Sequence, residues 1–199
     1  MSAATTKAAT LAELPDTFTF AQATAAGMTK HALYQLRDSG AIEALARGIY
    51  RRADAELADH GLIAIATAAP LATLCLASAL SLHGLSDDIP SAPDIALPRG
   101  ARAPAVASPA RWHHFAADTF HVGRDLRPMD STISIGIYSA ERSIIDAFRT
   151  RGREGHELGN TALRRWLRRR GSHPADLLDL ARHWPRTLTP LRTALDVLL

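Results

Sequence analysis

The sequence predicts an α+β fold, in which a small head of short helices and a hairpin precedes a mixed α/β body with a short sheet and C-terminal helices. Two observations predict it. Residues 18–52 combine two short helical segments with a pair of apolar, strand-like segments. Residues 94–138 contain short alternating segments typical of strands, whereas residues 139–198 return to helical periodicity.

Composition and turn residues divide the chain into three parts. Residues 1–16 are expected to form a flexible N-terminal arm, residues 17–53 a compact domain, and residues 54–199 a larger α+β domain. Helices are expected in the larger domain at 57–69, 74–83, 139–149, 155–170, 174–183 and 187–198. Strands are expected at 94–97, 111–115, 119–122 and 131–138.

Composition also limits the classes of function. No run approaches the roughly 20 apolar residues that span a bilayer, and the N-terminus lacks the continuous apolar core of a signal peptide. Cys75 is the only cysteine, which excludes an internal disulfide. We therefore expect a cytoplasmic protein with no membrane partner.

The charge is unevenly distributed, although the formal net charge is only +3. Residues 1–53 hold six basic and four acidic residues, residues 54–139 hold five and nine, and residues 140–199 hold twelve and seven. A basic head and tail suit a protein that meets phosphate at selected surfaces. Arginine outnumbers lysine by 21 to 2, and GC-rich coding explains part of that excess.

A helix-turn-helix is predicted within the head. A short helix over 20–26 ends at Gly27, which can adopt the left-handed conformation of a tight turn. Thr29 is a natural N-cap for a second helix over 30–38. Two leucines on one face of that second helix are expected to pack inward: Leu33 and Leu36.

The opposite face of the second helix carries side chains suited to reading DNA. Glutamine and arginine match the donors and acceptors on base edges, while lysine and threonine hold phosphate. The start of the helix also offers backbone N–H groups to a phosphate. The expected contacts in the major groove are Thr29, Lys30, His31, Tyr34 and Gln35, with Arg37 at the edge.

Residues 42–52 predict a two-stranded hairpin that turns near Arg47-Gly48. A hairpin after the second helix is a wing, and its arginines are expected to contact backbone phosphate or the minor groove. These arginines are Arg47, Arg51 and Arg52. Together the elements predict a winged helix-turn-helix that binds double-stranded DNA. The alternative is a small helical subdomain whose polar face is only solvated.

Several motifs match a known family. In the head they are FAQA (20–23), GMTK (27–30), LYQL (33–36), Gly40 and RGIYR (47–51), and in the body SALSLHGL (78–85), IALPRG (95–100) and SAERSIIDAF (139–148). These segments resemble AbiEi-type antitoxins over roughly residues 18–150. The third motif of the body departs from the family by having Ser143 where threonine is common.

The resemblance implies a role as the antitoxin of a bacterial type IV, abortive-infection toxin–antitoxin module. It implies that the N-terminal domain binds inverted repeats in the protein's own promoter and represses the operon. It also implies that the C-terminal domain counters a nucleotidyltransferase-like toxin without a stable toxin–antitoxin complex. A stand-alone regulator without a toxin, or an interaction protein whose body binds a partner, is the alternative.

The most concentrated charge lies within residues 164–170. Leu163, Trp166 and Leu167 share one helical face, and arginines occupy the others. These arginines are Arg164, Arg165, Arg168, Arg169 and Arg170. They form either a solvated helix face or a second nucleic-acid patch, on DNA or on RNA.

We expect no catalytic residues, no metal site and no cofactor. His113 and His114 are adjacent on a strand, so they point to opposite faces and do not share a metal easily. Phosphate-binding loops and nucleophile elbows are missing from the sequence. A nuclease fused to the winged helix is the enzymatic alternative, with Asp87, Asp88 and Asp94 as metal ligands. Restriction-type nuclease sites also need an acidic-x-Lys element, but both lysines of the chain lie in the head.

Two further features have structural explanations. His83 lies at a predicted helix end, where a capping or dipole role is favoured. Glu141 lies in the first turn of a predicted helix, and Arg142 and Asp146 have the spacing of an ion pair between successive turns. We therefore interpret these groups as structural rather than catalytic.

Overall fold

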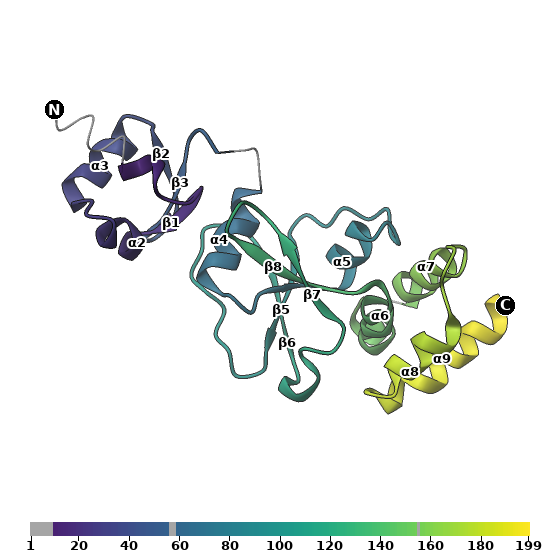
Figure 1. Cartoon of the computed structure of the whole chain (residues 1–199). Coiled ribbons are helices and arrows are strands. Elements are labelled where there is room, and N and C mark those ends of the chain that lie inside the picture. Colours follow the sequence, from purple (N-terminus) through teal and green to yellow (C-terminus); the bar gives the residue numbers. More distant parts are fainter. Residues whose placement is uncertain (1–9, 56–58, 155) are drawn as a thin grey trace. The chain divides into compact units, whose positions relative to one another are not determined.

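The computed structural model describes residues 10–55, 59–154 and 156–199 (Figure 1). The chain divides into two compact units. The first contains residues as far as Pro70 together with 104–109 and 127–135, and the second contains 71–103, 110–126 and 136–199. The first unit thus extends beyond the boundary expected at residue 53, because two later segments of the chain pack with it.

The first unit contains the two helices and the hairpin where the sequence predicts them. Its elements are β1 (Thr17–Thr19), α2 (Phe20–Ala25), α3 (Lys30–Asp38), β2 (Ile42–Ala46), β3 (Ile49–Arg52) and α4 (His60–Ala68). The strands form an antiparallel sheet in the order β1-β3-β2. Strand β1 is not predicted from the sequence, because three residues are too few to show an alternating pattern.

Both helices of the head pack on this small sheet through an apolar core. The buried members include Leu14, Phe18, Leu33, Ile42 and Tyr50, and Leu36 packs against them partly exposed. The backbone N–H of Arg52 also donates to the carbonyl oxygen of Asp16 at 2.9 Å. Residues 10–16 therefore pack within the unit rather than forming part of the arm expected over 1–16, of which residues 1–9 lie outside the described residues.

A five-stranded mixed sheet follows, in the order β6-β5-β4-β8-β7. Its strands are β4 (Thr73–Leu74), β5 (Asp94–Pro98), β6 (Arg111–Phe115), β7 (Arg124–Pro128) and β8 (Ser134–Tyr138). Strand β4 is antiparallel to β5 and parallel to β8, and β5 is parallel to β6. The ends of β7 and β8 that fall within residues 127–135 are counted with the first unit.

One predicted strand is wrong. Residues 119–122 form no strand; they follow a 3-10 helix, η1 (Ala117–Thr119), and the strand starts later, at Arg124. Phe120 is wholly buried, and its carbonyl oxygen accepts a hydrogen bond from the hydroxyl of Tyr138 at 2.9 Å. Gly123 then turns the chain with φ +65°, a conformation that favours glycine. The apolar residues at 120 and 122 therefore belong to a turn that is held by the hydrogen bond from Tyr138, and they do not form a strand.

The second unit ends in helices packed around α6 (Figure 1). The helices are α5 (Leu76–Leu82), α6 (Ala140–Glu154), α7 (His156–Leu167), α8 (Pro174–Ala181) and α9 (Pro185–Leu198). Their core includes Ile144, Ile145, Leu163, Trp166 and Leu191, all almost fully buried. Each helix lies close to its predicted range, although α6 runs five residues past the end predicted at 149.

A charged network lies inside this helical unit. Arg142 and Asp146 are both wholly buried, and Nε of the arginine lies 2.8 Å from the carboxylate. Arg142 Nη1 also donates to the carbonyl oxygens of Thr119 and Val122, at 2.9 and 2.6 Å. Burial raises the pKa of the Asp146 carboxyl, and the neighbouring guanidiniums oppose that rise. Arg142 and Asp146 thus form the predicted ion pair within α6, and Arg142 also connects this helix to η1 and to the turn that follows η1.

Candidate nucleic-acid interface

The turn between α2 and α3 is fixed by caps at both helices. Thr19 and Gln22 form a capping box at the start of α2, and Gly27 has φ +85° after its end. The side chain of Thr29 accepts a hydrogen bond from the backbone N–H of Ala32 at 3.1 Å and so caps α3. These contacts satisfy helix ends locally, which holds α2 and α3 in the helix-turn-helix arrangement.

Helix α3 divides into a buried and an exposed face, as its sequence predicts. Ala32 and Leu33 are buried, whereas Leu36 is half-buried against the same core. The six side chains predicted for the groove all lie on the exposed face: Thr29, Lys30, His31, Tyr34, Gln35 and Arg37. The geometry therefore brings these six together on one side of a single helix.

The exposed side chains of α3 contact one another. Tyr34 lies between two cations, with Lys30 Nζ at 5.6 Å and the guanidinium carbon of Arg37 at 4.8 Å from its ring centre. Gln35 Nε2 lies 2.8 Å from His31 Nε2, one turn away on the same helix. Arg37 also forms an exposed ion pair with Asp38 at 2.8 Å. Base readout by Gln35 or Arg37 would have to exchange these contacts for contacts with DNA.

The predicted wing is present as the β2–β3 hairpin. Gly48 has φ +75° at the turn, and Arg47 beside it is exposed. Arg52, at the end of β3, is half-buried and donates to the carboxylate of Asp54 at 2.9 and 2.7 Å. Hydrogen bonding to Asp54 raises the pKa of Arg52, which stays fully charged. Arg47 is thus exposed at the turn, whereas Arg52 already shares its charge with a carboxylate.

Arg51 does not lie where the sequence analysis expects it. Its side chain is only 2% exposed, and its Nη1 donates to the hydroxyl of Thr17 at 2.9 Å and to the carboxylate of Asp130 at 2.8 Å. The expected placement of Arg51 on the phosphate-facing surface is therefore wrong. Tyr50 packs in the apolar core of the head, so the alternation of β3 places Arg51 on the opposite face of the strand. It is buried there because Thr17 and Asp130 lie against it.

Asp130 is a structural partner of Arg51 that the sequence does not reveal. It accepts hydrogen bonds from the backbone N–H groups of Thr132 and Ile133, at 2.9 and 2.6 Å, and this ties residues 127–135 into a turn. Its partners Thr17 and Arg51 lie 113 and 79 positions away in the sequence. The Asp-Ser-Thr sequence signals the local turn, but nothing in the sequence signals the distant arginine.

The arginine-rich segment of the body has two kinds of side chain. Arg165 pairs with Asp87, and Arg169 donates to the carbonyl oxygen of His83. The other three arginines are exposed, with no ion pair to any part of the chain that the structure describes: Arg164, Arg168 and Arg170. Two members of the predicted patch thus serve contacts between elements of the second unit, and three remain at its surface.

Two of the three carboxylates considered as metal ligands form ion pairs instead. Asp94 is buried, and its carboxylate meets Arg111 at 2.8 Å and His113 at 2.9 Å. Asp87 pairs with Arg165. Within residues 10–55, 59–154 and 156–199, no group of three or more His, Cys, Asp and Glu side chains is arranged to hold a metal ion. His83 caps α5, and its ring lies 2.8 Å from the carbonyl oxygen of Tyr138, which supports the structural interpretation.

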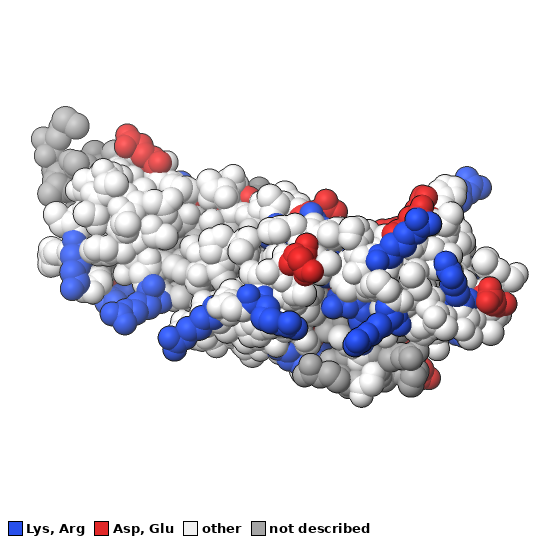
Figure 2. Space-filling model, turned by 90° about the horizontal axis from the view of Figure 1, so that it is seen from below, with Lys and Arg blue, Asp and Glu red and all other residues white. Residues whose placement is uncertain are grey.

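At the left of Figure 2, separate basic side chains lie along the lower edge of a largely uncharged face, and acidic side chains lie near its top. Two capped helices with a glycine turn, followed by a hairpin, define a winged helix-turn-helix. Residues 7–53 match a family model described as "Transcriptional regulator, AbiEi antitoxin". The N-terminal region thus carries a transcriptional-regulator domain of this family, and the resemblance predicted from its motifs is confirmed there.

The match ends at residue 53, so it does not extend to the five-stranded sheet and the C-terminal helices. No curated protein matches the chain. Among the helices of the described residues, none combines the length and apolarity that a membrane crossing requires.

Proposed function

We propose that the protein is a sequence-specific DNA-binding regulator that inserts α3 into the major groove. The observation that carries this proposal is the exposed face of α3, where six polar side chains gather beside a capped helix start. The buried face of the same helix is fixed by Leu33, so the polar face has one orientation. In this arrangement Lys30 and Thr29 contact phosphate, Gln35 and Arg37 contact base edges, and Arg47 contacts the flanking backbone.

Binding to the DNA upstream of the protein's own gene tests this proposal. Fluorescence anisotropy with a labelled duplex measures the dissociation constant, and an unrelated duplex measures specificity. The double variant Lys30→Ala with Gln35→Ala is expected to weaken binding to the upstream duplex by at least about tenfold. Arg192→Ala, an exposed change on α9, is the control. Absence of binding at low salt, or equal affinity in the double variant, contradicts the proposal.

The regulated promoter is proposed to be the protein's own, in an operon with a nucleotidyltransferase-like toxin. The family match of residues 7–53 supports this role. A promoter–reporter fusion is expected to be repressed by the wild-type chain and released by the same α3 variant. Co-expression with the product of the neighbouring gene tests the antitoxin role. Rescue of growth without co-purification supports it, whereas repression without rescue indicates a stand-alone regulator.

The three exposed arginines of the body, Arg164, Arg168 and Arg170, are proposed to add a second contact with nucleic-acid phosphate. Changing all three to Gln is expected to lower the salt dependence of binding, because each phosphate contact releases about one counterion. The measurement is the slope of log affinity against log salt, taken with duplex DNA and with RNA. If the slope is unchanged with both DNA and RNA, the three arginines form only a solvated surface.

A further inference from the structure

Two adjoining hollows run along α9 in the second unit. The first, of about 560 Å³, surrounds the start of the helix, and its wall includes Arg149, His183, Trp184 and Arg186. The second, of about 490 Å³, follows the helix towards its C-terminus. Phe148 and Pro190 line both hollows. We call the two together the α9 groove.

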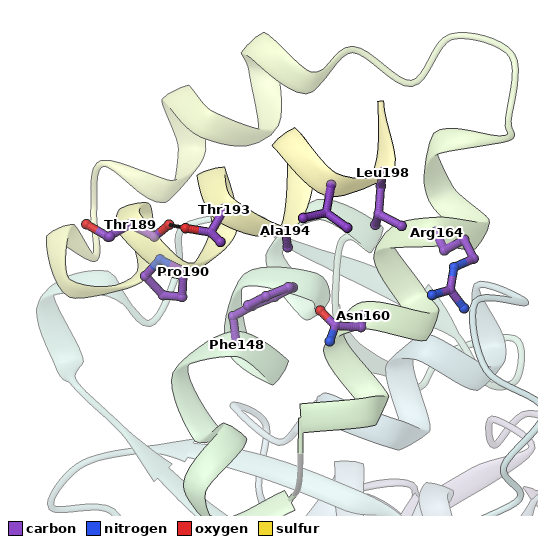
Figure 3. A pocket seen from close by; sticks show the side chains of 9 residues that line it. Phe148, Asn160, Arg164, Thr189, Pro190, Thr193, Ala194 and Leu198 are labelled. Atoms are coloured by element: carbon purple, nitrogen blue, oxygen red, sulfur yellow. Dashed lines mark hydrogen bonds between the residues drawn. The ribbon is translucent and has the colours of Figure 1, made fainter.

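The far part of the α9 groove has an apolar floor. Figure 3 shows Phe148 opposite Pro190 and Ala194, with Asn160 and Arg164 at one side. Thr193 turns its hydroxyl to the backbone of its own helix, donating to the carbonyl oxygen of Thr189 at 3.1 Å. This part therefore offers apolar surface flanked by a single guanidinium.

The near part of the groove is cationic. Arg149, His183 and Arg186 line it, and no Asp or Glu is among the described residues that line either hollow. The guanidinium carbons of the buried Arg142 and of Arg149, which itself lines the hollow, lie 4.0 and 5.1 Å from the ring centre of Trp184. These two guanidiniums share one carboxylate, that of Asp146. The wall thus carries an excess of positive charge.

The start of α9 adds to this field. The N-cap residue Trp184 makes no side-chain capping bond, and the first turn contains no acidic residue. Pro185 at the first helical position has no N–H, and the N–H of Thr187 donates to the carbonyl oxygen of Trp184 at 2.8 Å, so the end of this 14-residue helix contributes mainly its positive dipole to the cationic hollow. Arg186 lies in that first turn, where its charge opposes the dipole unless an anion is present. The positive end of the helix and the basic side chains therefore both favour a negatively charged ligand.

We propose that the α9 groove binds a small organic phosphate, with the phosphate at the start of α9 and an apolar body on Phe148 and Pro190. Phosphate fits because its several oxygens can accept hydrogen bonds from two guanidiniums and an imidazole at once. A bare anion would leave the apolar floor exposed to water, so an organic body contributes further affinity. This site is independent of the proposed DNA contacts of α3.

Isothermal titration of the full chain tests the proposal with three probes: phenyl phosphate, inorganic phosphate and phenol. Phenyl phosphate is expected to bind saturably and about tenfold more tightly than inorganic phosphate, since it adds an apolar ring. Phenol, which lacks the charge, is expected to give no saturable heat. Arg186→Gln is expected to weaken phenyl phosphate about tenfold by removing a charged donor.

The matched control is Arg192→Gln, which removes an exposed arginine from the same helix outside both hollows. Its affinity is expected to equal that of the wild type. No saturable binding of phenyl phosphate overturns the proposal, as does an equal loss in Arg186→Gln and Arg192→Gln. Equal affinities for phenyl phosphate and inorganic phosphate overturn the assignment of the apolar floor. Thermal unfolding of each variant confirms that it is folded before titration.

Discussion

Arg51 and Asp130 lie 79 positions apart in the sequence, yet their side chains meet at 2.8 Å with only 2% of each exposed. Thr17 bonds to both of them, so β1, β3 and the segment 127–135 share one buried polar contact. The winged helix is therefore completed by a piece of chain from far beyond its own sequence. A fragment ending at residue 53 would leave the Arg51 guanidinium without this carboxylate.

We predict that Asp130→Asn destabilises the first unit. The substitution removes the negative charge that faces the buried Arg51 guanidinium, and the loss of one charge of a buried ion pair costs about 3–5 kcal/mol in the free energy of unfolding. Urea denaturation of the full chain measures it. Asp125→Asn removes an exposed carboxylate from β7 and is the control, with little change expected. Equal stabilities of the two variants would show that the pair contributes nothing.

The same carboxylate predicts a dependence of stability on pH. Burial alone would raise the pKa of Asp130, but hydrogen bonds from Thr17, from two backbone N–H groups and from Arg51 outweigh it, so the pKa is lowered. Because the folded pKa lies below the unfolded one, the stabilisation is complete above about pH 4 and is lost as the pH falls through the folded value. The stability difference between wild type and Asp130→Asn should therefore shrink below about pH 4. A difference that is constant with pH would contradict this.

The local features of the head could be predicted from the sequence. Gly27, Thr29 and the leucine spacing of α3 act over a few residues, so the pattern alone places the helices and their polar face. The exposed position of Arg47 can be predicted because a glycine marks the turn beside it. Arg51 was not, because a charged residue on a short strand signals exposure until its buried partner is known.

Long-range contacts explain the other errors. Phe120 lies in an apolar segment that resembles a strand, but the hydroxyl of Tyr138 holds it in a turn. Strand β4 has only two residues and takes its place from partners on either side, Ile95 and Ile137 among them. Nothing in the sequence indicates that Trp184 and Arg186 line a groove, because the α9 groove forms only where α6 and α9 pack together.

The hydroxyl of Thr29 is expected to serve both the cap of α3 and the contact with DNA. Thr29→Ala removes the side-chain acceptor for the N–H of Ala32 and should lower the free energy of unfolding by about 1 kcal/mol. Thr29→Ser keeps the hydroxyl and should keep both stability and affinity for DNA. Thermal unfolding and anisotropy of the two variants measure these effects. A loss of DNA affinity in Thr29→Ser equal to that in Thr29→Ala would show that the methyl group matters, not the hydroxyl.

Gly136 permits the close approach of β7 and β4 to β8. A Cβ at this position would lie 2.5 Å from both Arg124 Nη2 and Thr73 Oγ1. Since Arg124 Nε also donates to Thr73 at 2.7 Å, neither side chain can move without losing a hydrogen bond. We predict that Gly136→Ala costs about 1–3 kcal/mol in stability, measured by urea denaturation. Gly152→Ala, in open space on α6, should instead be neutral or stabilising.

Arg47 and Arg52 of the wing should differ in their effect on DNA binding. Arg47→Gln removes a cation from the exposed turn, and the slope of log affinity against log salt should fall in magnitude by about one. Arg52 already donates to Asp54, so Asp54→Asn should strengthen binding by about threefold, because it removes a competing charge from the surface that meets phosphate. Anisotropy over a range of salt concentrations measures both. Unchanged binding in Arg47→Gln together with weaker binding in Asp54→Asn would place the wing away from the duplex and would leave α3 as the sole contact.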